Sequence, residues 1–221
     1  MSAALSAGAT TFATSSIHWE TIRVRRLQPR HPVPGRDHHR RRCRRYPDGG
    51  EAVIPDLSSF DAGTLVCAVG AAGSGKSTLF STMPESSIVC LDELRLRLAD
   101  DAGNQRVTPQ AVRMQNLILR TRMELGLTTG VDSTNVEERV RATVLKPALA
   151  HGRRTVAVVF LTPLETCLAR NALRPANTRV PDDRVAWQHR QTPRSAARLR
   201  REGFAEVYFV GVADAASGRG A

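Results

Sequence analysis

Apolar residues gather in short runs in the part of the chain that follows about residue 63. Five of these runs are continuous enough for strands that are buried on both faces of a sheet. They cover residues 64–69, 87–91, 127–131, 155–161 and 207–212. Stretches with helical spacing separate most of the runs. Alternating strands and helices predict an α/β fold, with a parallel sheet of about five strands sandwiched by helices and right-handed crossovers.

The longest predicted helix follows the second apolar run. Thr108 is the expected N-cap, Pro109 occupies the first helical position, and Gly126 is the stop. The inward face predicted for this helix carries Met114, Leu117, Ile118 and Leu125.

Two further helices are predicted from their start signals. Asn135 and Glu138 are spaced as a capping box after the third run. Thr162 begins a helix after the fourth run, and its inward residues are expected to be Leu164, Cys167 and Leu168.

The first quarter of the chain has a different composition. Residues 21–50 are rich in Arg, His, Pro and Gly and show no apolar period, so they cannot bury enough surface to offset the cost of ordering. We therefore predict a disordered Arg-rich tail over residues 1–55 and a globular domain over residues 56–221. Residues 1–50 hold ten arginines and three acidic residues, which account for +7 of the net charge of +11. The tail is either a basic arm that lies on phosphates or a solvated, non-specific extension.

Composition excludes several classes of protein. The 221 residues are 41% hydrophobic, and no apolar run approaches the roughly 20 residues of a membrane span. Met1 to Ser16 lack a cationic start before an apolar block, so no secretory signal is expected. The four cysteines are widely spaced, which disfavours a disulfide framework and a zinc site of the usual spacing. These features predict a cytoplasmic protein that does not act at a membrane. Of the 32 basic residues, 30 are Arg, a bias that can reflect the coding sequence as much as function. The high charge by itself is therefore weak evidence for a nucleic-acid partner.

A phosphate-binding motif follows the first strand directly. The segment GAAGSGKST has the G-x-x-x-x-G-K-S pattern of a P-loop between a strand and a helix. Glycines let successive N–H groups face an anion, the lysine reaches the β- and γ-phosphates, and the serine hydroxyl contacts Mg²⁺. The alternative is a glycine-rich turn without a nucleotide. The predicted ATP-binding residues are Gly70, Ala71, Ala72, Gly73, Ser74, Gly75, Lys76, Ser77 and Thr78, with Ser77 as the metal contact.

Asp92 ends the second strand, at the edge where parallel sheets bind ligands. If a helix begins here, Asp92 and Arg95 share a face, and the carboxylate can accept a proton from an attacking hydroxyl while the guanidinium holds an anionic group. Asp92 is alternatively a plain N-cap or a metal anchor. Residues 94–98 also alternate as a strand would, which would separate the two side chains.

Two more polar clusters follow the third and fourth strands. Residues 132–135 have the sequence DSTN. They face a substrate or magnesium-bound water, form the turn before the next helix, or do both. Arg170 and Arg174 lie four residues apart, on one helical face just before a loop between two prolines. They either belong to a mobile loop over the γ-phosphate or form a solvated basic helix end.

Taken together, these segments resemble the polynucleotide 5′-hydroxyl kinase branch of AAA-type P-loop kinases, and in particular the kinase module of bacterial RNA-repair polynucleotide kinase-phosphatases. The matching segments are GAAGSGKST (70–78), LDELR (91–95), DSTN with Arg139 (132–139), CLARNALR (167–174), VP (180–181) and EGFAEV (202–207).

The resemblance implies a role for each matching residue. Lys76, Asp92 and Arg174 would be catalytic: Asp92 would activate the 5′-hydroxyl, and Arg174 would clamp the phosphates of ATP. Arg95 would contact the phosphate next to the accepting end. The predicted acceptor-binding residues are Arg95, Asp132, Thr134, Arg139 and Arg170.

The sequence thus predicts ATP- and Mg²⁺-dependent transfer of a phosphoryl group to a hydroxyl, with the 5′-hydroxyl end of RNA or DNA as the expected acceptor. Two alternatives stay open. One is a small-molecule kinase of the zeta-toxin kind, which would need a closed pocket near Arg95 rather than an open basic path. The other is a non-catalytic ATP-binding module whose tail binds nucleic acid.

Overall fold

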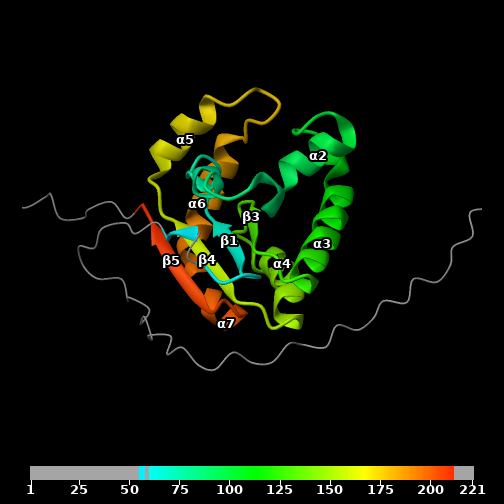
Figure 1. Ribbon diagram of the computed structural model, residues 1–221. Helices are drawn as coiled ribbons and strands as arrows, with labels where there is room; N and C mark the ends of the chain where they lie inside the picture. Colours follow the sequence, from blue (N-terminus) through cyan, green and yellow to red (C-terminus); the bar gives the residue numbers. More distant parts are fainter. Residues whose placement is uncertain (1–54, 58–59, 212–221) are drawn as a thin grey trace, which may run out of the picture. The chain divides into compact units, whose positions relative to one another are not determined.

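The computed structural model describes residues 55–57 and 60–211 (Figure 1). The predicted disorder of the tail and the final residue of the fifth predicted strand lie outside these residues. In the described part of the chain, no helix is long and apolar enough to cross a membrane.

A parallel sheet of five strands forms the centre, in the order β2-β3-β1-β4-β5. The strands are β1 (Leu65–Val69), β2 (Ile88–Cys90), β3 (Thr129–Asp132), β4 (Thr155–Phe160) and β5 (Glu206–Val210). All five predicted runs therefore form strands, and the predicted fold class is confirmed. Because every neighbouring pair is parallel, the carboxyl ends of the strands lie along one edge, where Cys90 of β2 pairs with Asp132 of β3.

Helices cover both faces of the sheet, as Figure 1 shows. Their bounds are α1 (Lys76–Phe80), α2 (Leu91–Ala99), α3 (Thr108–Glu124), α4 (Glu138–Ala150), α5 (Leu164–Ala172), α6 (Asp182–Ala196) and α7 (Leu199–Glu202), with short 3₁₀ turns η2 (Glu85–Ser87) and η3 (Gln105–Val107).

Successive residues of β1 point into two separate cores. Leu65, Cys67 and Val69 pack on one face with side chains from α2, α3, α4 and α7. Val66 and Ala68 pack on the other face with side chains from α1 and β4. This alternation follows from the strand period of two, and it explains why the run has no polar position.

The inward face of α3 differs from the prediction. Leu117 and Leu125 are exposed, whereas Met114 and Ile118 are partly buried. Because α3 contacts both α2 and α4, its buried line is rotated to residues with a spacing of four. That line consists of Ala111, Gln115, Leu119 and Met123. The predicted N-cap was also wrong by one position, since Thr108 is the first helical residue and Val107 is the cap.

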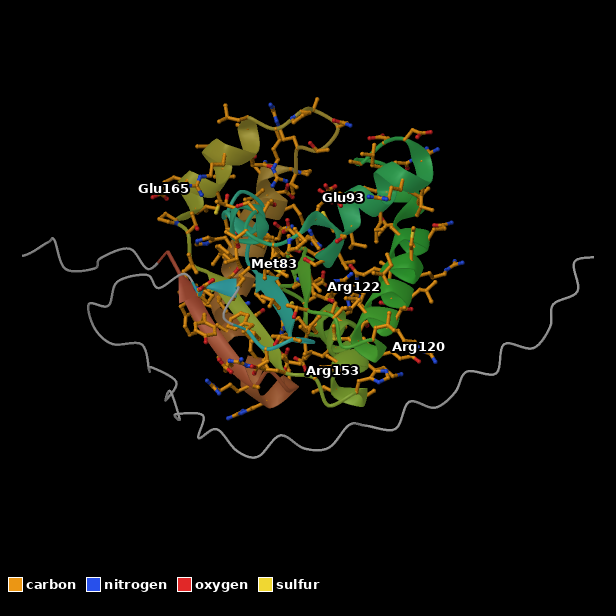
Figure 2. The ribbon with its side chains drawn as sticks, in the orientation of Figure 1. Met83, Glu93, Arg120, Arg122, Arg153 and Glu165 are labelled. Carbon is orange, nitrogen blue, oxygen red and sulfur yellow. The ribbon has the colours of Figure 1, made fainter. Side chains whose placement is uncertain are left out.

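Several arginines serve the fold. The guanidinium of Arg122 on α3 donates to the carbonyls of Ser86 and Thr128 and to the hydroxyl of Thr129. Arg153 donates to the carbonyl of Met123, and both arginines are labelled in Figure 2. These side chains satisfy backbone carbonyls at the loops that join the elements. Arg122 and Arg153 therefore have structural roles.

Candidate active site

The P-loop, residues 70–78, connects β1 to α1 at the centre of the carboxyl edge. Gly73 and Gly75 have φ angles of 79° and 100°, a conformation that favours glycine. A Cβ atom on Gly73 would lie 2.3 Å from the carbonyl oxygen of Cys167 on α5, so no side chain fits there. The amide of Ala72 donates to Oε1 of Gln188 on α6 at 2.9 Å. The loop is therefore fixed by the helices behind it before any ligand binds.

Lys76 lies inside this loop and is buried. Its Nζ donates to the carbonyl oxygen of Ala71 at 2.7 Å. Burial lowers the pKa of Lys76 to about 8; the carboxylate of Asp132 opposes this shift most strongly, and Arg174 adds to it. A buried ammonium with a single neutral acceptor suits an anionic ligand, because phosphate oxygens would supply the missing charge.

The lowered pKa predicts that ATP affinity depends on pH. Bound phosphates favour the charged ammonium, so the complex holds a proton that the free protein loses above about pH 8. The Kd for ATP should be constant below this pH and rise above it by up to about tenfold per pH unit. Titration calorimetry on either side of pH 8 measures this change. A Kd that stays constant well above pH 8 would contradict the assignment of Lys76 as the phosphate ligand.

Asp92 lies in the first turn of α2, which settles the ambiguity of residues 94–98 in favour of a helix. Arg95 follows one turn later, and its Nη2 pairs with Oδ1 of Asp92. The Arg95 side chain is buried, whereas the Asp92 side chain is 50% exposed. Nε of Arg95 also donates to the carbonyl of Ala102 at 2.7 Å. The buried guanidinium thus holds the accessible carboxylate in one position, and the N-cap of α2 is Cys90 rather than Asp92.

The segment that follows β3 is bound to the P-loop. The amide of Gly70 donates to the carbonyl of Thr134 at 3.0 Å. Nδ2 of Asn135 donates to the carbonyl of Ala68 at 2.8 Å, and the Asn135 backbone has a φ of 47°. The predicted capping role of Asn135 was therefore wrong, since α4 begins at Glu138 after the cap residue Glu137. Its amide is instead used to join β3 to β1.

Arg141 supports the same segment from below, a contact that the sequence analysis did not find. Its side chain is 1% exposed and forms a bidentate pair with Glu202, with both N–O distances at 2.6 Å. Its third donor, Nη1, reaches the carbonyl of Asn135 at 2.8 Å. Arg141 therefore links Glu202, the first residue of the EGFAEV segment (202–207), to the loop that carries Asp132 and Thr134.

Glu202→Gln is expected to lower the free energy of unfolding by roughly 3–5 kcal/mol, because it leaves a buried guanidinium without its carboxylate. Chemical denaturation measures this loss. The control is Glu138→Gln, which breaks the exposed pair with Arg198 at 3.1 Å and should cost less than about 1 kcal/mol. Equal losses of unfolding free energy in the two variants would show that the buried pair stabilises the fold no more than the exposed pair does.

Arg170 and Arg174 lie above the P-loop, on α5 and just after it. Nη1 of Arg170 is 3.4 Å from the carbonyl oxygen of Gly73. Asn171 closes the loop that follows: its Nδ2 donates to the carbonyl of Val180 at 2.6 Å, and its Oδ1 accepts from the Val180 amide at 3.1 Å. The loop is thus held at its base, with Arg174 on its first part.

The same loop contacts the segment after α2. Nδ2 of Asn177 donates to Oδ1 of Asp101 at 2.9 Å, and a Cβ on Gly103 would overlap the carbonyl oxygen of Asn177. Figure 1 shows these two loops meeting at the top of the view, between α5 and α2. They join the side of the site that carries Asp92 to the side that carries Arg174.

A cavity of about 1270 Å³ lies between these elements. The predicted site residues that line it are Ala72, Gly73, Ser74, Gly75, Lys76, Ser77, Thr78, Asp92, Asp132, Thr134, Arg170 and Arg174. Arg95 and Arg139 are not among its lining residues: Arg95 is buried behind Asp92, and Arg139 lines a second cavity. Gly70 and Ala71 form the base of the P-loop.

The residues present fit a nucleotide with its metal. The hydroxyls of Ser74 and Ser133 are buried without a partner among the described residues, and both residues line the cavity. No cluster of three or more His, Cys, Asp and Glu side chains that could hold a metal occurs in residues 55–57 and 60–211. Mg²⁺ binds phosphates, water and one or two protein oxygens rather than a cage of side chains. Ser77 and Asp132 are two of the lining residues that could supply these protein oxygens.

A family model described as an AAA domain matches residues 65–197, more than half of the chain. The chain belongs to the AAA domain family. The matched residues include the P-loop, Asp92, Arg170 and Arg174. This AAA domain is therefore a kinase-like P-loop domain, and a domain of this kind implies nucleotide binding. No curated protein matches the chain.

Solved structures similar to the AAA domain have low identities. A protein of Chloroflexus aurantiacus J-10-fl that carries a provisional kinase name is 13% identical, with a TM-score of 0.47, over 68% of this chain and 89% of that one. A chain of the Pnkp1/Rnl/Hen1 complex is 21% identical, with a TM-score of 0.44, over 55% of this chain and 42% of that one. Shikimate kinase from Bacteroides thetaiotaomicron is 12% identical, with a TM-score of 0.42, over 66% and 86%. These likenesses do not identify the acceptor.

Proposed function

We propose that the domain transfers the γ-phosphoryl group of ATP to a hydroxyl, and that the acceptor is the 5′-hydroxyl end of a polynucleotide. The observation that carries the transfer is the shared cavity: Lys76, Asp92 and Arg174 come from three separate segments, and all three line it. A phosphate ligand, a carboxylate base and a cation for the transferred group are the parts that phosphoryl transfer requires.

In this proposal, each side chain has one task. Lys76 and the P-loop amides hold the β- and γ-phosphates, and Arg174 neutralises charge that develops on the transferred group. Asp92 takes the proton of the acceptor hydroxyl while Arg95 fixes its orientation. Mg²⁺, held by Ser77 and by Asp132, would neutralise phosphate charge. Among the carboxylates that act on Lys76, Asp132 has the larger effect, which supports placing Asp132 rather than Asp92 on the metal side.

The polynucleotide acceptor is supported by the six segments that resemble polynucleotide kinases. A second candidate is a small alcohol. Burial of Arg95 and the contact between Asp101 and Asn177 favour it, because they make the region around Asp92 more closed than an open basic path.

One assay decides between the candidates. The full chain is incubated with γ-labelled ATP, Mg²⁺ and a panel of 5′-hydroxyl oligonucleotides and small alcohols. We expect label on the 5′ ends. Label only on small alcohols would show that the proposed acceptor is wrong and that the proposed phosphoryl transfer is right. Binding of ATP without labelling of any acceptor would support a non-catalytic module.

A further inference from the structure

A second cavity, of about 420 Å³, lies between the start of α4 and one face of α6. Arg139, Arg194 and Arg198 line it, together with Trp187. The proposed transfer of phosphate uses none of these side chains. The cavity therefore needs an explanation of its own.

Arg139, Arg194 and Arg198 form weak ion pairs or none within the described residues. Arg139, whose side chain is 84% exposed, pairs with Glu137 at 2.8 Å, and the exposed Arg198 pairs with Glu138. Arg194 forms no ion pair with any residue in the described part of the chain. Exposed pairs of this kind contribute little, so an anion can displace the carboxylates from them.

The charge around the cavity is positive. Arg184 stacks on Trp187, with its guanidinium carbon 4.1 Å from the ring centroid, and reaches Glu137 at 3.6 Å. The arginines at positions 139, 184, 194 and 198 thus face the two carboxylates of Glu137 and Glu138, an excess of two positive charges. Arg141 also lines the cavity, but Glu202 neutralises it.

The N-terminus of α4 adds to this field. The helix has 13 residues, and its cap residue Glu137 makes no side-chain hydrogen bond to the first turn. The cap and the first two helical residues line the cavity, so the positive end of the helix lies at its wall. A helix start together with several arginines forms a site for a phosphate group.

The second cavity is connected to the main one through the segment that follows β3. Asp132 and Thr134 line the main cavity, and the same segment continues into Glu137 and Arg139 of the second. Arg139 follows Thr134 by five positions, so their Cα atoms lie within about 18 Å of each other. This distance corresponds to a few nucleotides of a strand.

We propose that the second cavity binds an internal phosphodiester of the acceptor strand, a few nucleotides from its 5′-hydroxyl end. This inference rests on the proposed polynucleotide acceptor. It assigns Arg194 and Arg198 to strand binding, away from the reacting atoms, so these residues set the affinity for long acceptors and leave turnover unchanged.

The test compares the full chain with the double variant Arg194→Gln/Arg198→Gln. The control is Arg120→Gln, an exposed arginine on α3 that lines neither cavity (Figure 2). We measure Kd by fluorescence anisotropy over a series of salt concentrations, for a long 5′-hydroxyl oligonucleotide and for a dinucleotide. The Arg-rich tail is present in all proteins, so its contribution cancels.

The double variant should bind the long strand roughly tenfold more weakly, and the slope of log Kd against log salt should fall by about 0.7 for each phosphate that the arginines no longer neutralise. Its KM for the long acceptor should rise equally, with kcat and dinucleotide binding unchanged. An unchanged Kd and salt slope for the long strand would overturn the inference, as would an equal loss in the control. If the wild-type chain labels no 5′ end, the proposed function fails, and the binding data still decide whether this cavity holds a strand.

Discussion

Lys76→Ala should lower the kcat of phosphoryl transfer by about 10²-fold or more while the fold is retained. The ammonium is the buried cation of the P-loop, and it lies between the carbonyl of Ala71 and the cavity where the phosphates are expected. Its removal deletes charge stabilisation that grows as the γ-phosphoryl group leaves. The loss of one such donor typically lowers kcat by about 10²–10³, and loss of ATP affinity adds to the effect on kcat/KM. The rate of label transfer from ATP measures it.

The chain offers a matched control for this variant. Lys146 is the other lysine of the sequence, and it is exposed on α4. Lys146→Ala should transfer phosphate at the wild-type rate. Circular dichroism and the unfolding midpoint should be similar for both variants, because Lys76 makes one hydrogen bond and no ion pair within the described residues. Wild-type activity in Lys76→Ala would remove the basis for placing ATP in this loop.

The sheet and the P-loop could be predicted because their signals are local. A continuous apolar run specifies a strand buried on both faces, and the motif places its glycines where φ is positive, at Gly73 and Gly75. The clash of a Cβ on Gly73 with Cys167 of α5 is a long-range reason for the same glycine, which the sequence does not reveal.

The contacts around the acceptor segment could not be predicted because their partners are distant in sequence. Asn135 fits a cap by its spacing from Glu138, but its amide bonds the carbonyl of Ala68, 67 residues earlier. Arg141 reads as one more solvated charge on a helix, yet it is buried against Glu202, 61 residues later. In both cases, tertiary hydrogen bonds outweighed the local preference.

Residues 94–98 could not be assigned from the sequence for a different reason: their local pattern fits two kinds of secondary structure. The alternation of Leu and Arg fits a strand, and a helix fits equally well by length. Of its three leucines, only Leu94 is buried in the folded domain, whereas Leu96 and Leu98 are exposed. The alternation therefore carries no packing information, and the contact of α2 with α3 decides the helix.

Asp92→Asn should lower kcat by about 10²–10⁴, the range that a positioned general base contributes. The Kd for ATP should change little, because Asp92 acts on the acceptor hydroxyl and affects Lys76 less than Asp132 does. Amide and carboxylate have the same shape, so the side chain still accepts a hydrogen bond from Arg95 but no longer takes a proton. Single-turnover rates with labelled ATP and calorimetric ATP binding separate the two effects.

Glu93→Gln is the matched control for Asp92→Asn, since Glu93 is exposed on the next position of α2 and does not line the cavity (Figure 2). It changes the charge of the helix start by the same amount, and it should leave kcat within about twofold of wild type because exposed charges interact weakly. The kcat of Arg95→Gln should lie between those of Asp92→Asn and Glu93→Gln, because this substitution removes the ion pair that holds the Asp92 carboxylate but keeps the carboxylate itself. Equal losses of turnover and of ATP affinity in Asp92→Asn would assign this carboxylate to the metal instead. An effect of the same size in Glu93→Gln would show that the loss in Asp92→Asn comes from the changed charge at the start of α2 and not from the loss of a base.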